Sequence, residues 1–358
     1  MKIDIIGSIP PPVGGISVHI KRTKKKLIEQ GIECKVYNEA QWGNIKENVY
    51  PISTYKSFIF KIPFLKADIL HFHSIDMKVR MLLGVYKFFG KKIILTVHGE
   101  SLINQIDSSN KLVKYLLLKG LKKIDKIICV NDQNTQYLKQ LGFEPDKIIT
   151  IPAYINPIED KEDIENIPNF VWEFIENKKF VISANGCVRF YNNEDLYGID
   201  LLIKLVHRLR QESIDVSLVF VVLDVESQNE KEKLYYQSLK KRIHEYNLAS
   251  NILFYEAKDT ELYPILSKSH LFIRPTNTDG YGVSIAEALH YKIPSIASNV
   301  CIRPEGTILF NSRDNTDLYA KTLDVIENYE NYIKENEDYK LKDNFCDLHN
   351  LYVSVIKN

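Results

Sequence analysis

The sequence predicts an α/β protein built from two tandem, doubly wound domains that face a cleft. Its 358 residues are enough for two domains of ordinary size, each with its own core. In both halves short apolar runs alternate with helical segments, which is typical of a parallel sheet covered by helices on both faces. A segment rich in charge and proline, 156–178, interrupts this alternation and predicts a linker or the entry to a second unit.

The N-terminal domain is predicted to span residues 1–160. It begins with an apolar strand at 2–7, followed by the loop "SIPPPVGG" and a helix from about Ser17 to Gln30 that ends at Gly31. The further strands are predicted at 32–38, 67–74, 91–99, 125–131 and 147–153, with helices at 111–123 and 132–140.

The C-terminal domain, residues 161–340, repeats the pattern. Its strands are predicted at 180–186, 216–224, 251–257, 271–276 and 294–298, and its helices at 199–212, 230–247, 260–268 and 283–291. The polar tail from 315 is predicted to be helical, and we expect the helix at about 340–358 to pack back onto the N-terminal domain. Sheets of this kind bind ligands at the carboxyl ends of their strands, so we expect a ligand between the domains.

The composition is that of a soluble globular protein, with 45% hydrophobic and 26% charged residues. No apolar run approaches the roughly 18 residues that span a bilayer, and the short apolar start argues against a secretory signal. Five scattered cysteines without a Cys-x-x-Cys pair favour a reducing compartment over a zinc cluster or a disulfide framework. We therefore expect a cytoplasmic protein without a zinc cluster or a disulfide framework.

The net charge of +1 conceals a difference between the halves. Residues 1–150 contain 24 Lys and Arg against 13 Asp and Glu, whereas residues 151–358 contain 23 against 33. A basic half favours an anionic partner, with chance surface composition as the alternative. The helix after the glycine loop carries five cations among apolar residues, and we expect it to dock peripherally on an anionic membrane. These cations are Lys21, Arg22, Lys24, Lys25 and Lys26.

Two features of the N-terminal half are candidate sites. Gly14 and Gly15 would let the backbone approach a ligand closely, and the helix that follows offers free N–H groups to an anion. The loop lacks the G-x-G-x-x-G spacing of dinucleotide folds, which disfavours a dehydrogenase, and a simple tight turn is the alternative. His98, at a strand end, could hydrogen-bond a sugar or accept a proton, although many single histidines are structural.

In the C-terminal half, Gly186 follows a strand and Arg189 lies three residues further on. The planar, permanently charged guanidinium suits a diphosphate, with an ordinary surface arginine as the alternative.

The second C-terminal feature is the segment "DGYGVS", which leads into a helix. Its glycines allow tight backbone geometry, and the N–H groups at the helix start could bind an anion. Asp279 in the loop and Glu287 on the second helical turn could accept hydrogen bonds from hydroxyls at opposite ends of one ligand. A capping Asp and a solvated Glu are the alternative.

Together, "PPxGGIS", "TVHG" and "DGYGVSIAEALHYKIPSIAS" resemble the retaining glycosyltransferases of the GT-B fold, with two Rossmann-like domains. The resemblance covers nearly the whole chain and is most specific in the last motif. It implies transfer of a sugar from a nucleotide sugar, UDP- or GDP-linked, to a saccharide or lipid-linked saccharide acceptor in bacterial surface polysaccharide biosynthesis. It implies no metal, cofactor or nucleic-acid partner.

The resemblance also assigns roles to residues. The family motif is E-x7-E, with the first acid near the donor sugar and the second on the ribose, and these roles fall on Asp279 and Glu287. His98 falls beside the donor sugar, and Gly14 and Gly15 fall near the diphosphate. The remaining donor-binding residues implied are Gly186, Arg189, Gly280, Tyr281, Gly282, Val283 and Ser284.

Two departures from the family pattern bear on function. Asp279 is one methylene shorter than the usual glutamate, and Tyr197–Gly198 stands where the family has Lys-Gly, so the second cation is missing or comes from elsewhere, with Arg303 as a candidate. A degenerate sugar-nucleotide-binding subunit and a sugar-nucleotide epimerase of the same fold are the alternatives. A phosphorylase would need a lysine carrying pyridoxal phosphate, which we cannot identify.

Overall fold

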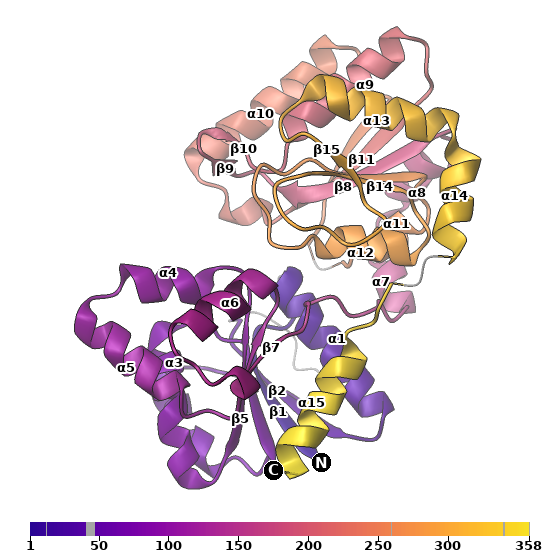
Figure 1. The fold of residues 1–358 in the computed structure, drawn as a ribbon. Helices are drawn as coiled ribbons and strands as arrows, with labels where there is room; N and C mark the ends of the chain where they lie inside the picture. The colour runs from indigo at the N-terminus through magenta and orange to yellow at the C-terminus, as the bar shows by residue number, and fades with distance from the viewer. Residues whose placement is uncertain (12, 41–46, 259, 339–340, 358) are drawn as a thin grey trace. The chain divides into compact units, whose positions relative to one another are not determined.

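The computed structural model describes the chain except residues 12, 41–46, 259, 339–340 and 358 (Figure 1). Pro12 of the glycine loop therefore lies outside the described residues. Two compact units form, of which unit 1 holds Met1–Ile155 and Asp343–Asn358 and unit 2 holds Asn156–Lys342. No helix in the described part of the chain is long and apolar enough to cross a bilayer.

Unit 1 is built on a parallel sheet of seven described strands in the order β3-β2-β1-β4-β5-β6-β7. The strands are β1 (Lys2–Gly7), β2 (Glu33–Asn38), β3 (Val49–Pro51), β4 (Ile69–Phe72), β5 (Lys92–Val97), β6 (Lys126–Cys129) and β7 (Ile148–Thr150). The α/β prediction is confirmed, and the sequence analysis missed β3 because three residues at a sheet edge are too few to show a period.

Helices cover both faces of this sheet. On one face lie α1 (Gly15–Glu29) and α15 (Phe345–Lys357), which bury apolar side chains against β1, β2 and β4. On the other lie α2 (Tyr55–Lys61), α3 (Met77–Tyr86), α4 (Ser101–Ser108), α5 (Lys111–Leu121) and α6 (Asp132–Gln140). The close packing of α3 on α5 requires Gly84, because a Cβ there would lie 2.4 Å from the carbonyl oxygen of Gly120.

Unit 2 contains a parallel sheet of six described strands in the order β12-β11-β8-β13-β14-β15. They are β8 (Val181–Cys187), β11 (Ser217–Leu223), β12 (Ile252–Glu256), β13 (Leu271–Arg274), β14 (Ser295–Ser298) and β15 (Ile308–Phe310). A short antiparallel hairpin, β9 (Phe190–Tyr191) with β10 (Glu194–Asp195), follows β8. β11 is a continuous apolar run because both of its faces are covered.

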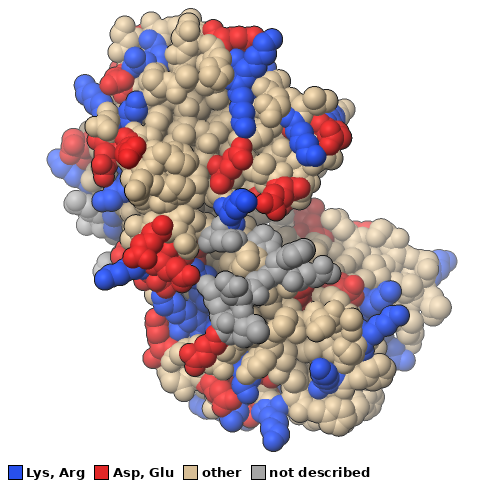
Figure 2. Space-filling model, turned by 180° about the vertical axis from the view of Figure 1, so that it is seen from behind, with Lys and Arg blue, Asp and Glu red and all other residues tan. Residues whose placement is uncertain are grey.

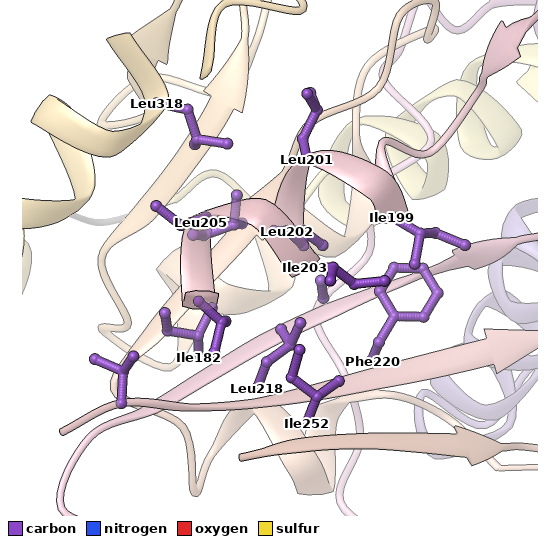
Figure 3. Packing of buried hydrophobic residues seen from close by; sticks show 14 of the residues in the cluster. Ile182, Ile199, Leu201, Leu202, Ile203, Leu205, Leu218, Phe220, Ile252 and Leu318 are labelled. Atoms are coloured by element: carbon purple, nitrogen blue, oxygen red, sulfur yellow. The ribbon is translucent and has the colours of Figure 1, made fainter. Parts of the chain in front are cut away.

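The helices of unit 2 also lie on both faces. α9 (Ile199–Gln211), α10 (Glu230–Glu245) and α13 (Asn315–Glu327) bury one apolar cluster, and α8 (Asn169–Glu176), α11 (Tyr263–Leu266) and α12 (Val283–His290) bury the other. Figure 3 shows Leu202 and Ile203 of α9 directed toward Leu218 and Phe220 of β11. Two further helices are α7 (Lys161–Glu165) and α14 (Tyr329–Asp338). Since α8 buries Val171 in this core, residues 156–178 include the start of unit 2.

Candidate functional site

The carboxyl end of β13 carries a cluster of one acid and two arginines. Arg274, the last residue of β13, donates from Nε to Oδ2 of Asp279 at 2.5 Å and from Nη2 to Oδ1 at 3.2 Å. Arg303 donates from Nη1 to the same Oδ2 at 2.6 Å. The backbone N–H of Gly280 adds a bond to Oδ1 at 3.0 Å. Asp279 is thus held on both carboxylate oxygens by groups of its own unit.

This environment fixes the charge of Asp279. Burial opposes ionisation, but the guanidinium groups of Arg274 and Arg303 outweigh it and hold the pKa of Asp279 well below its usual range. Asp279, Arg274 and Arg303 together leave one net positive charge at the start of α12. A carboxylate with this many donors is better placed to orient the arginines than to accept sugar hydroxyls.

The two arginines differ in what surrounds them. Arg303 has a side chain only 1% exposed, and it also donates to Ser298 and Thr276 inside the unit. Arg303, the candidate for the second cation, is therefore a buried residue that stabilises the loops around Asp279, Thr276 and Ser298. Arg274 instead reaches Ser284 Oγ at 3.3 Å, and its guanidinium lies 5.6 Å from the centre of the Tyr197 ring.

Arg274 was missed by the sequence analysis. A signal was present, because a permanently charged residue ends a strand that is otherwise apolar and lies directly before the turn to α12. Its proximity to Tyr197, which is distant in sequence, could not be read from the chain.

At the carboxyl end of β8, Gly186 lies against Tyr197. A Cβ on Gly186 would be 2.2 Å from the Tyr197 ring, so packing already explains this glycine. Arg189 donates to Glu232 at 2.7 Å and to Asp224 at 3.0 Å. The sequence-predicted Arg189 thus has two carboxylate partners and is not bound to Asp279.

Arg189 and Arg274 both act electrostatically on the same two side chains, Cys187 and Tyr197. Burial raises the pKa of the Cys187 thiol to about 11, and the positive charges of both Arg189 and Arg274 act on this thiol in the opposite direction. Arg274 and Arg189 likewise oppose the burial that raises the pKa of Tyr197. Both guanidinium groups, each paired with a carboxylate, are therefore close enough to act electrostatically on Cys187 and Tyr197.

The predicted start of α12 has the expected backbone geometry. Gly282 is the residue before the helix and has φ +86°, a left-handed conformation that glycine adopts without strain. A Cβ on the exposed Gly280 would meet nothing within 4 Å. Ser284 and Glu287 are buried on the helix, with Glu287 5% exposed, while Tyr281 and Val283 are half-buried.

In unit 1 the glycine pair is not explained by packing. Gly14 has φ −166°, an extended conformation open to any residue, and Gly15 does not have a positive φ. A Cβ on Gly15 would meet nothing within 4 Å, and one on Gly14 would meet only Ser17 Oγ at 4.0 Å. The close approach of a ligand therefore stays the prediction for this pair.

His98 belongs to a cluster of four histidines from α1, β4 and the loops after β4 and β5. His98 Nε2 is 2.9 Å from His73 Nδ1, and the ring centres of His71 and His73 are 4.2 Å apart. His19 lies within 5.5 Å of His73 and His98 by ring centres, and its Nδ1 donates to the Ala153 carbonyl oxygen at 2.7 Å. The sequence analysis treated His98 as a single histidine.

The cluster is uncharged at neutral pH. Burial lowers the pKa of His19 to about 4 and that of His71 to about 3; for His19 the hydrogen bond to the Ala153 carbonyl oxygen opposes the shift and the charge of Arg22 adds to it. The pKa values of His73 and His98 are also well below the usual range for the same reasons. His71 is further fixed by Tyr352 Oη and Thr96 Oγ1, each at 2.7 Å. His98 is therefore a neutral, half-buried group suited to hydrogen bonding.

Comparison with known proteins identifies the family. Residues 13–158 match the family described as Glycosyltransferase Family 4, and residues 174–339 match Glycosyl transferases group 1. The chain belongs to the group 1 glycosyltransferases of the GT-B fold. An uncharacterized glycosyltransferase of Methanocaldococcus jannaschii is 22% identical to this glycosyltransferase over 348 residues, 92% of this chain and 90% of the relative.

Solved structures share the fold along the whole glycosyltransferase chain. A glycosyltransferase from Rickettsia africae has a TM-score of 0.69 at 16% identity, covering 100% of this chain and 99% of the other. Anabaena HepE, solved with UDP and glucose, has a TM-score of 0.63 at 13% identity and coverage of 100% and 97%. Sucrose-phosphate synthase from Thermosynechococcus elongatus has a TM-score of 0.64 at 14% identity and covers 100% of both chains.

Proposed function

We propose that this protein is a retaining glycosyltransferase that moves a sugar from a UDP- or GDP-sugar to a saccharide or lipid-linked saccharide acceptor. The proposed process is surface polysaccharide biosynthesis in the cytoplasm, at the inner face of the cell membrane. HepE, which has the same fold, was solved with UDP and glucose, and this favours a UDP-sugar donor.

The observation that carries the proposal is the pair of cations at the carboxyl ends of β8 and β13. Arg274 is held in place by Asp279 and lies beside Tyr197, where the family pattern has a lysine. We propose that Arg274 supplies the second cation for the donor diphosphate, next to Arg189 and the first N–H groups of α12. Positive charge aligned on the departing diphosphate lowers the barrier to transfer and needs no metal ion.

In this proposal Asp279 positions Arg274, and it acts on the donor only through that arginine. Glu287 binds the ribose and His98 hydrogen-bonds the donor sugar. The acceptor hydroxyl attacks from the side of the leaving group, and a phosphate oxygen takes its proton, so the anomeric configuration is retained. This route does not require a carboxylate of the enzyme to act as a nucleophile.

The proposal is tested first by finding the donor. A thermal-shift screen of nucleotide sugars should reveal one that raises the melting temperature, since a ligand of the folded state stabilises it by mass action. Release of the nucleoside diphosphate should then depend on an added acceptor and persist in EDTA, and NMR of the product should show a retained anomer. Conversion of the donor without an acceptor would indicate an epimerase. Binding without turnover of any donor–acceptor pair would indicate a degenerate subunit.

The role of Arg274 has its own test. Arg274→Gln should weaken UDP binding in calorimetry by roughly 10- to 100-fold, as for a lost hydrogen bond to a charged group, and leave uridine binding unchanged. Arg313→Gln is the matched control, since Arg313 forms a comparable pair with Asp200 at 2.8 and 2.9 Å. Equal losses of UDP affinity in the two variants would contradict the direct role of Arg274.

A further inference from the structure

Unit 1 exposes large aromatic side chains on segments that do not belong to the candidate site. Phe60 of α2 is 76% exposed, Phe64 of the short helix η1 (Ile62–Phe64) is 79% exposed, and Phe88 of η2 (Lys87–Phe89) is 78% exposed. α5 adds an outward-facing row of Leu112, Tyr115 and Leu116, while Leu117 and Leu121 fill the core. Single exposed apolar residues are ordinary, but a group on neighbouring segments marks an interaction surface.

Contacts along this side of unit 1 join the segments. Tyr86 at the end of α3 donates to the Ile59 carbonyl oxygen of α2 at 3.5 Å, and Lys91 donates to the carbonyl oxygen of Leu65, the residue after η1. Lys123, just after α5, lies 4.9 Å from the centre of the Phe88 ring. Figure 1 shows α3 and α5 lying alongside each other, as their glycine contact requires.

The same segments are rich in lysine and free of acid. Residues 48–67, 77–99 and 108–124 together contain 13 Lys and Arg and no Asp or Glu, while Asp107 and Asp125 at their borders pair with Lys114 and Lys87. Lys119 lies 5.4 Å from the centre of the Tyr115 ring, so charged and aromatic groups are interleaved. We call these residues the aromatic–lysine surface. Its members are Phe60, Phe64, Phe88, Phe89, Leu112, Tyr115, Leu116, Lys119, Lys122 and Lys123.

We propose that the aromatic–lysine surface docks unit 1 on an anionic membrane. A partner for this surface must accept apolar rings and neutralise lysines at once. Anionic phospholipid does both, because rings enter the boundary between headgroups and acyl chains while lysine stems lie along it with their ammonium groups outward. The attraction of the lysines to anionic headgroups and the burial of the aromatic rings then add, and together they give reversible peripheral binding without a spanning helix.

The surface differs from the helix that the sequence analysis chose. In α1 all five cations are buried or half-buried. Arg22 donates to the Ile155 carbonyl oxygen at 2.9 Å, Lys24 donates to that of Glu47 at 2.5 Å, and Lys26 pairs with Asp343. α1 also packs on the opposite face of the sheet from α3 and α5. The expected membrane contact through α1 is thus replaced by one on the other side of unit 1.

Charge alone does not single out a docking face. On the face shown in Figure 2, basic and acidic side chains are mixed over both units. The combination of exposed aromatic rings with an excess of lysines is what distinguishes the aromatic–lysine surface.

The test is sedimentation with vesicles of phosphatidylglycerol and phosphatidylcholine, compared with phosphatidylcholine alone, at low and high salt. The wild-type protein should bind only the anionic vesicles and should dissociate as salt rises. The triple variant Phe60→Ser, Phe64→Ser and Phe88→Ser should lower the partition coefficient at least roughly tenfold, because three rings leave the interface. Lys119→Gln with Lys122→Gln and Lys123→Gln should weaken the salt dependence. All six side chains are exposed, so melting temperatures should be unchanged.

Two control variants match the test in chemistry and differ in place. Leu234→Ser with Ile302→Ser removes side chains of unit 2 that are 71% and 78% exposed, and Lys241→Gln with Lys258→Gln and Lys268→Gln removes three exposed cations of unit 2. Both should bind vesicles like the wild type.

Three results would overturn the proposal. They are an absence of binding to anionic vesicles at low salt, equal binding by the phenylalanine variant and the wild type, and loss of binding in a control variant alone. A concentration-dependent dimer that the phenylalanine variant abolishes would assign the surface to a second copy of the chain and overturn it as well.

Discussion

The four-histidine cluster predicts that unit 1 loses stability as the solution is acidified below neutral pH. Burial lowers the pKa of His19 to about 4 and that of His71 to about 3, whereas a histidine in the unfolded chain titrates near pH 6.5. Between these values the unfolded state binds more protons than the folded state. The stabilisation is therefore complete above about pH 6.5 and falls as the pH drops toward the folded-state value.

The size of the effect follows from the same values. At pH 5, a histidine whose pKa falls from about 6.5 to about 4 on folding costs roughly 2 kcal/mol of stability relative to its neutral state. His71 contributes a similar amount, and His73 and His98 act in the same direction. The sum is a large fraction of the roughly 5–15 kcal/mol that stabilises a typical domain. Within unit 1, Asp4, whose pKa burial raises to about 6, and Glu39, whose pKa burial also raises, act in the opposite direction as the pH falls.

Because these carboxylates oppose the histidines, the test measures the difference in unfolding free energy between a variant and the wild type rather than the pH dependence of the wild type alone. His19→Asn keeps a donor for the Ala153 carbonyl oxygen but removes the titrating ring. In urea unfolding at pH 7, His19→Asn should have a lower free energy of unfolding than the wild type. At pH 5 this difference between the two proteins should be smaller by roughly 2 kcal/mol. Hydrogen exchange of peptides from β4 and β5 assigns the change to unit 1. His207→Asn in unit 2 is the control, and a deficit of His19→Asn that is equal at both pH values would refute the reasoning.

Three further predictions concern single residues. Glu287→Ala should weaken UDP and UDP-sugar binding alike by roughly 1–3 kcal/mol in calorimetry, and unchanged affinity would exclude a ribose contact. His98→Ala should lower kcat more than nucleotide affinity, because the ring is expected to face the sugar, and normal turnover would remove it from the site. Gly186→Ala should lower the melting temperature, because its Cβ would lie 2.2 Å from the Tyr197 ring, and adding Tyr197→Ala should recover part of the loss. An unchanged melting temperature in Gly186→Ala would contradict that packing.

Much of the fold could be predicted from the sequence because its strands are buried on both faces. Such strands appear as short continuous apolar runs, and β1, β5, β8 and β11 were all predicted within a few residues of their bounds. Elements that lack this signal were missed. β3 has only three residues, and α3 has Gly84 at its contact with α5, which interrupts an otherwise helical pattern.

The candidate site was predictable as a set of positions and much less as a set of contacts. The tight turn before α12 could be predicted because glycine allows backbone conformations that other residues avoid, and Gly282 does have a positive φ. The partners of Asp279 do not follow, since Arg303 is 24 residues away and reaches it only through the fold. The same holds for the histidines, which approach one another because β1, β4 and β5 are neighbours in the sheet.

The two departures from the family pattern and the arginine at the end of β13 form one physical unit. Tyr197 is uncharged where the resemblance implies a lysine, and its ring packs where Gly186 leaves room. Arg274 lies 5.6 Å from the centre of that ring and places a positive charge at these strand ends. Both carboxylate oxygens of Asp279 accept hydrogen bonds from Arg274, and this two-point contact orients the planar guanidinium. Under the proposed function, Tyr197 leaves position 197 without a cation and Arg274 supplies one at the neighbouring strand end, so that the diphosphate still meets two cations.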